Sequence, residues 1–99
     1  MIRHTVAFKL KHGAGSENEL NFLRAAQKLA DIPTVNNFEC FRQVSEKNNY
    51  DFGLSMDFNS KAGYQAYNEH PDHIQFVETL WIPEVVEFME IDYVRYSES

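Results

Sequence analysis

A phenol, Tyr67, and two imidazoles, His70 and His73, lie within seven residues of one another. Imidazole is the side chain that exchanges protons near neutral pH without perturbation. The ring of Pro71 restricts the backbone between the two histidines, which constrains their relative positions. The segment therefore predicts a proton-transfer or ligand-binding site. The alternative is structural, because a His-Pro step is also an ordinary way to leave a helix and either imidazole can hydrogen-bond a nearby carbonyl.

The composition predicts one folded domain and limits its partners. The chain has 99 residues, of which 43% are hydrophobic and 14% aromatic, which is ample for a single core. The formal net charge is −6, and residues 69–99 hold eight acidic side chains against Arg95 alone. An acidic domain without a basic stripe repels phosphate, so we expect neither nucleic acid nor an anionic membrane as a partner.

The only cysteine, Cys40, excludes an internal disulfide. It lies in an alternating apolar run, where we expect a small buried residue and not a nucleophile. The chain enters strand-like sequence at Ile2 with no basic segment followed by an apolar run, and no stretch reaches the roughly 18 apolar residues of a membrane span. We therefore expect a cytoplasmic protein.

The hydrophobic period changes along the chain in the order strand, helix, strand, strand, helix, strand. Alternation predicts strands over residues 2–10, 38–44, 50–58 and 85–96, the middle two forming a hairpin. A helical stripe runs to about Ala30, with Ser16 and Glu19 spaced as a capping box. Ser60 suits the N-cap of a short helix over 61–68, and more helix is expected over 73–80. This order predicts a ferredoxin-like α+β fold, with an antiparallel sheet and both helices on one face.

His4 interrupts the apolar face of the first strand. An unpaired imidazole there would be costly, and the nearest polar groups on the helix side are those of the His-Pro turn. We therefore predict that His4, Tyr67 and His73 converge on one partly enclosed cavity. The residues expected to bind a small organic ligand beside them are His70, at the edge, Val6 and Phe8.

The other face of the predicted sheet is mixed and small, neither a good solvent face nor a filled core. Its expected members are Thr5, Ala7, Phe41, Gly53, Ser55 and either Val86 or Met89. A half-apolar surface of this width is often covered by a second copy, so we predict a homodimer. A charge at Val86 or Phe88 should dissociate it, unless those side chains face the helices.

Over essentially its whole length, the chain resembles the stress-responsive A/B barrel domain (Dabb) family. The resemblance rests on the opening 2–10, the hairpin end 50–54, the helix entry 58–60, and above all the tyrosine followed by His-Pro-x-His at 67–73. It implies a dimeric α+β barrel, in which the sheets of two ferredoxin-like protomers face each other. Its informative relatives are plant polyketide cyclases of the olivetolic acid type, in which a tyrosine and a histidine of this turn assist an aldol closure.

Tyr67 and His73 match that pair, while His4 and His70 match two further histidines of the family. The resemblance implies that His73 removes a proton next to a carbonyl while Tyr67 donates a hydrogen bond to its oxygen. His4 would steady or shuttle the proton. Binding without catalysis stays open, as does a structural interpretation in which Tyr67 packs, His70 caps and His73 bonds a strand carbonyl.

Other kinds of site are less favoured. No spacing among His4, His70, Asp72 and His73 fixes three inward metal ligands, so we expect no metal and no cofactor. Trp81, the only tryptophan, is expected in the core, and His12, beside a glycine turn, in solvent.

Overall fold

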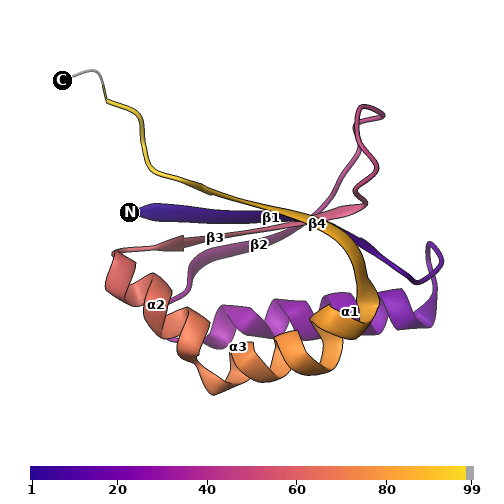
Figure 1. Cartoon of the computed structure of the whole chain (residues 1–99), viewed down its shortest axis with the longest axis horizontal. Helices are drawn as coiled ribbons and strands as arrows, with labels where there is room; N and C mark the ends of the chain where they lie inside the picture. Colours follow the sequence, from indigo (N-terminus) through magenta and orange to yellow (C-terminus); the bar gives the residue numbers. More distant parts are fainter. Residues whose placement is uncertain (98–99) are drawn as a thin grey trace.

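Four antiparallel strands form the sheet of the computed structural model, which describes residues 1–97. The strands are β1 (Ile2–Leu10), β2 (Asn36–Arg42), β3 (Phe52–Phe58) and β4 (Val85–Tyr93), and their order across the sheet is β2-β3-β1-β4. The helices all cover one face of this sheet, which leaves the other face open (Figure 1). The predicted ferredoxin-like α+β fold is confirmed.

The helical layer consists of two stretches of chain. The first is α1 (Glu17–Gln27), which tightens into the 3-10 turn η1 (Lys28–Asp31). The second contains α2 (Lys61–Glu69), α3 (Pro71–Phe76), the π-helical segment η2 (Val77–Trp81) and the short α4 (Ile82–Glu84). Both serines cap as predicted, because Ser16 Oγ accepts from the Glu19 N–H at 3.2 Å and Ser60 Oγ accepts from the Gly63 N–H at 3.1 Å.

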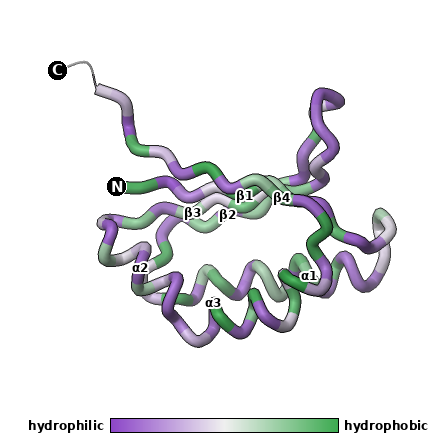
Figure 2. Tube along the Cα trace, viewed as in Figure 1, coloured by the Kyte–Doolittle hydropathy of each residue, from purple (hydrophilic) through white to green (hydrophobic). Residues whose placement is uncertain are grey.

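The core lies between the sheet and the helices. Alternate residues of β1 and β3 point into it, and Figure 2 shows apolar positions interspersed with polar ones along the chain. Phe8 is fully buried, and its ring centroid lies 5.8 Å from that of Phe22 and 5.1 Å from that of Trp81. These offset, tilted contacts are the arrangement that aromatic rings prefer. Trp81 is therefore a core residue, as expected.

Several helices and strands begin or end at residues other than those predicted. The hairpin strands stop at Arg42 and resume at Phe52, because the loop 43–51 makes its own bonds, among them Gln43 Nε2 to the Tyr50 carbonyl at 2.6 Å. Helix α3 begins at Pro71 and not at residue 73, because proline fits the first helical position. The last strand ends at Tyr93.

Two side chains lie elsewhere than expected. The prediction that His12 is solvated is wrong, because its side chain is only 12% exposed and Nε2 lies 2.5 Å from Glu84 Oε1. Phe88 faces the helices, where its ring meets that of Trp81 at 5.6 Å. Met89, paired with Ala7, lies on the open face, which is one of the two alternatives expected there.

Among residues 1–97, no helix combines the length and the apolar character needed to cross a membrane.

The aromatic core makes a direct stability prediction. Phe8→Ala should lower the free energy of unfolding by about 3–5 kcal/mol, because the lost ring leaves a cavity between the sheet and α1. Urea denaturation measures this difference. Val44→Ala, at a position 87% exposed in the hairpin loop, is the control and should change stability by less than about 0.5 kcal/mol. A loss below about 1 kcal/mol for Phe8→Ala would contradict the packing described.

Candidate functional site

His4 forms hydrogen bonds through one ring nitrogen, Nδ1, with residues of β4 and α2. The side chain lies on the helix face of β1, where the residue is 6% exposed, and Nδ1 lies 2.6 Å from Asp92 Oδ1. The Tyr64 hydroxyl donates to Asp92 Oδ2 at 3.0 Å and lies 2.8 Å from His4 Nδ1. Because a carboxylate only accepts, Nδ1 carries the proton. In neutral His4 the lone pair is then on Nε2, which has no partner among residues 1–97.

Tyr67 is a buried phenol whose hydroxyl has no hydrogen-bond partner among the described residues. It lies near the end of α2, one turn after Tyr64, and the residue is 3% exposed. Its ring centroid is 4.4 Å from that of His73 and 6.3 Å from that of His4. Burial, reinforced by the Glu90 carboxylate, raises the pKa of Tyr67 well above its ordinary value. The phenol therefore stays protonated and able to donate.

His73 is the third polar group, on the first turns of α3. Its Nδ1 lies 3.2 Å from the Asn68 carbonyl oxygen, so Nδ1 is the donor and Nε2 keeps the lone pair. Burial lowers the pKa of His73, against the opposing effects of the Asn68 carbonyl and Glu90. The imidazole is therefore neutral at pH 7 and able to accept a proton.

These three side chains line one small cavity. Its volume is about 40 Å³, and Glu90, Val6 and Trp81 also contribute to its walls. A space of this size admits water or a group of a few atoms. The neutral imidazole of His73 and the phenol donor of Tyr67, in a partly apolar cavity, together suit proton transfer to or from a small polar group.

The other predicted ligand-binding residues have different positions. His70 does not line the cavity: its Nδ1 accepts from the Asp72 N–H at 3.1 Å and so caps α3. Phe8 is packed in the aromatic core and is also absent from the cavity walls. The His70 side chain therefore caps a helix, as in the structural alternative. The His73 side chain bonds the Asn68 carbonyl, which belongs to helix α2 and is not the strand carbonyl of that alternative.

Sequence reasoning missed Tyr64, Glu90 and Asp92. Tyr64 precedes Tyr67 by three residues, the spacing of neighbours on one helix face. Glu90 and Asp92 interrupt the apolar alternation of the last strand as His4 interrupts that of the first. Two polar interruptions on strands that pair at His4 and Asp92 were the available signal.

Residues 1–97 contain no group of three or more His, Cys, Asp or Glu side chains arranged to hold a metal ion. Cys40 is unpaired, and burial raises the pKa of its thiol, which therefore remains protonated at neutral pH.

Comparison with known proteins places these observations in a family. The model of the stress-responsive A/B barrel domain, Dabb, matches residues 2–95. A solved Dabb family protein with a ferredoxin-like fold from Mesorhizobium loti is 52% identical over 97% of each chain, with a TM-score of 0.95. A dimeric ferredoxin-like protein of unknown function from Thermobifida fusca is 25% identical over 95% of this chain and 90% of its own, with a TM-score of 0.79.

The hydroxynitrile lyase from Passiflora edulis shares the fold, with a TM-score of 0.83 over 99% of this chain and 94% of its own, at 14% identity. No curated protein gives a significant match.

The lowered pKa of His73 predicts how stability depends on pH. In the unfolded chain this histidine protonates near its ordinary pKa of 6.5, whereas in the folded protein it protonates only at lower pH. Between these two values the unfolded state binds more protons, so its contribution to the free energy of unfolding falls as pH falls below about 6.5. Urea denaturation of the wild type and His73→Gln across this range should show a stability difference that varies with pH. A constant difference would contradict the burial of a neutral imidazole.

Proposed function

Because this chain belongs to the stress-responsive A/B barrel domain family, we propose that it is a homodimer that binds a small carbonyl compound and removes a proton next to the carbonyl group. One observation carries the chemical part of this proposal. A buried phenol without a protein partner, Tyr67, shares a cavity with two imidazoles whose Nε2 atoms also lack partners among residues 1–97.

The proposed step divides between base and donor. The Nε2 lone pair of neutral His73 takes a proton from the carbon next to the carbonyl, and the released electron pair moves onto the carbonyl oxygen as an enolate. Tyr67 donates its O–H to that oxygen, where negative charge develops. The imidazolium then returns its proton to the enolate. In a compound with a second carbonyl, the same enolate carbon can instead attack it, as in an aldol closure.

His4 supplies a second proton-accepting nitrogen at the same cavity. Asp92 fixes the proton on Nδ1, as the carboxylate does in a Ser-His-Asp triad, and stabilises the imidazolium that forms when Nε2 accepts. Tyr64 restrains this carboxylate from the other side. Asp92 and Tyr64 are positioning residues, because they act through His4.

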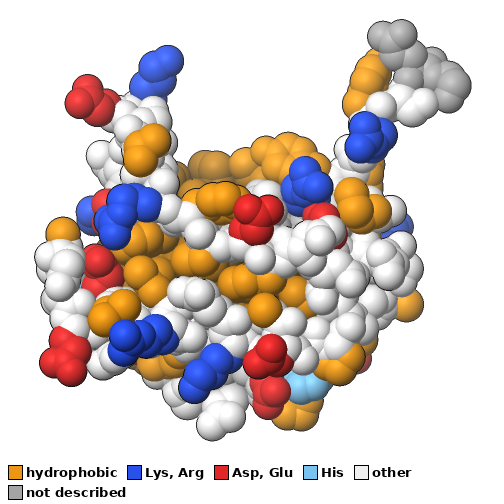
Figure 3. All heavy atoms as spheres, turned by 180° about the vertical axis from the view of Figure 1, so that it is seen from behind, with side chains coloured by type: hydrophobic (Ala, Val, Ile, Leu, Met, Phe, Trp, Pro, Cys, Tyr) orange, Lys and Arg blue, Asp and Glu red, His pale blue; other side chains and the backbone are white. Residues whose placement is uncertain are grey.

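The homodimer is supported by the open face of the sheet. Large side chains there are 41–52% exposed, and they flank small residues at the centre of the face. They are Phe41, Met89, Ile91 and Tyr93. In Figure 3 hydrophobic side chains gather along this upper surface, between the loop 43–51 and the C-terminal segment. An exposed apolar patch of this kind marks an interface, and the relative from Thermobifida fusca is described as dimeric.

Hydrogen exchange tests the proton-abstraction proposal. In heavy water the wild type should accelerate loss of the hydrogen signal between the two carbonyls of methyl acetoacetate, followed by proton NMR. His73→Gln should reduce the catalysed rate about 100-fold or more, and Tyr67→Phe by a similar factor. His70→Gln, outside the cavity, is the control and should keep most of the rate. A wild-type rate equal to buffer would reject catalysis, and a titration showing binding would then leave ligand binding alone.

Sedimentation at micromolar concentration tests the dimer. The wild type should sediment at twice its 11.6 kDa chain mass, and Ile91→Glu should sediment as a monomer, because it places a charge on the apolar open face. Leu20→Glu, on the helical layer, is the matched control and should remain dimeric. A monomeric wild type would remove the homodimer and with it the barrel.

A further inference from the structure

The inner cavity, the space of about 40 Å³ beside His73, meets solvent at Glu90. Within residues 1–97, Glu90 is the only residue lining this cavity that is exposed, whereas His73 and Trp81 are half-buried and the others are buried. The Glu90 side chain lies on the helix face of β4, as do those two residues before and after it, Phe88 and Asp92. Its carboxylate therefore lies at the opening of the cavity.

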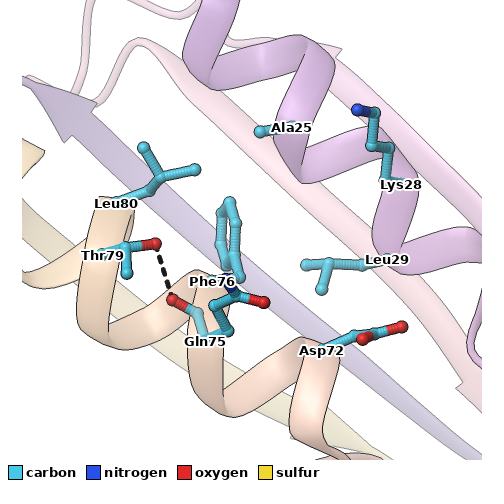
Figure 4. Close-up of a pocket in the computed structure, with 8 residues that line it drawn as sticks. All are labelled: Ala25, Lys28, Leu29, Asp72, Gln75, Phe76, Thr79 and Leu80. Carbon is cyan, nitrogen blue, oxygen red and sulfur yellow. Dashed lines mark hydrogen bonds between the residues drawn. The ribbon is translucent and has the colours of Figure 1, made fainter.

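The wall toward the outer surface of the helical layer consists of Leu29 and Phe76. Both are buried, and both also line an outer groove of about 300 Å³ between the two stretches of that layer (Figure 4). In Figure 4 the Phe76 ring rises from α3 between Leu29 and Leu80. These side chains separate the two spaces, and the inner cavity holds only a few atoms. A further group on a bound carbonyl compound therefore extends toward the opening, beside Glu90.

The Glu90 carboxylate is unpaired, and its charge acts on the interior of the cavity. It forms no hydrogen bond or ion pair with any of residues 1–97. Burial is the main cause of the shifted pKa of both Tyr67 and His73, and the charge of Glu90 acts on both groups as well. The negative charge at the opening is therefore close enough to influence the groups that the proposed reaction uses.

No positive side chain balances this charge at the cavity. In the described part of the chain, neither Lys nor Arg lines it, and Asp92 adds a second carboxylate behind His4. An anionic group at the opening would be repelled, whereas a cation would gain an ion pair with Glu90. Aromatic rings also attract cations at their faces, and three rings line the cavity, those of Tyr67, Phe76 and Trp81. The surroundings of the opening therefore favour positive charge.

We propose that Glu90 is the specificity-determining residue of the inner cavity, and that the substrate is a carbonyl compound that carries an ammonium group near its reacting end. This inference rests on the proposed function, because it names the substrate class of the same site. The ammonium group pairs with the Glu90 carboxylate at the opening, while the carbonyl oxygen accepts a hydrogen bond from Tyr67 further in. Free 3-oxo acids and phosphorylated carbonyl compounds are disfavoured by the same carboxylate.

Two esters of acetoacetic acid test this charge preference, because they have nearly the same shape. The choline ester carries a trimethylammonium group, and the 3,3-dimethylbutyl ester carries an uncharged tert-butyl group in its place. Hydrogen exchange at the carbon between the two carbonyls, followed by proton NMR in heavy water, gives kcat/KM for each ester. The ratio of kcat/KM for the choline ester to that for the neutral ester should be about tenfold higher in the wild type than in Glu90→Gln.

Two further variants sharpen this comparison. Glu78→Gln makes the same substitution at an exposed position of η2 that lines neither the inner cavity nor the outer groove, and it should keep the wild-type ratio. Glu90→Lys should reverse the preference, so that the neutral ester is favoured over the choline ester and the acetoacetate anion gains in kcat/KM. In the wild type, the ratio should also fall as salt rises, because salt screens the ion pair.

The outcomes separate this inference from the proposed function. If the wild type accelerates exchange of neither ester nor of methyl acetoacetate, the proposed function fails. If it accelerates exchange of methyl acetoacetate, but the ratio is the same in the wild type and in Glu90→Gln, the specificity proposal alone is overturned. Equal losses for both esters in Glu90→Gln would also overturn it. Thermal unfolding checks that the variants are folded. Should no Glu90 variant fold, a wild-type ratio that does not change with salt overturns the inference.

Discussion

The hydrogen bond between His4 and Asp92 is the constraint on which the site depends. It joins β1 to β4 on the helix face of the sheet, where an unsatisfied imidazole would cost about 1–3 kcal/mol. Tyr64 then bonds the same carboxylate while its ring stacks on Phe58 at 4.7 Å, almost parallel. Together these contacts fix α2 over the edge of the sheet. Tyr67, one turn further along the same helix, is thereby brought beside His4, and the His-Pro turn that follows brings His73 beside Tyr67.

The two faces of the sheet differ in how their polar groups are arranged. On the helix face, an apolar core surrounds a few polar groups, which line the cavity. On the open face, Asp57 is buried and receives hydrogen bonds from Arg3 at 2.9 Å and from Asn37 at 3.0 Å. The Arg3 guanidinium and Asn37 hold the pKa of Asp57 below its ordinary value, so it remains charged and paired. Asn37 adopts a left-handed backbone with φ of 51°. It lies at the start of β2, where the pairing with β3 shifts register between Asn36 and Glu39. On this face the polar Arg3–Asp57 pair joins the ends of the two central strands, and the large apolar side chains lie on the flanking strands β2 and β4.

The features that depend on local sequence could be predicted, whereas those that depend on contacts between distant residues could not. The order of elements and the caps at Ser16 and Ser60 were predictable, because burial period and capping are local properties. The argument that buried His4 requires a polar neighbour was within reach, but it named the wrong neighbours, because His4 bonds Asp92 and Tyr64 and not the His-Pro turn. The partners Asp92 for His4 and Glu84 for His12 were not predictable, because they depend on strand register and on where the last helix ends. The π-helical segment has no local signature in the sequence, so the position of Trp81 could be predicted only as buried.

Burial has opposite effects on the pKa values of the two central groups, and both effects favour the neutral form. It raises the pKa of Tyr67 and lowers that of His73, since in each case the charged form loses hydration. Glu90 reinforces burial at the phenol, because both disfavour the phenolate, but opposes it at the imidazole by favouring the imidazolium. The carboxylate thus moderates one shift while strengthening the other. A neutral acceptor whose protonated form is not prohibitively costly, beside a donor that does not ionise, is the combination that a reversible proton transfer to and from carbon requires. Burial in the same cavity therefore also sets the protonation states on which the proposed chemistry depends.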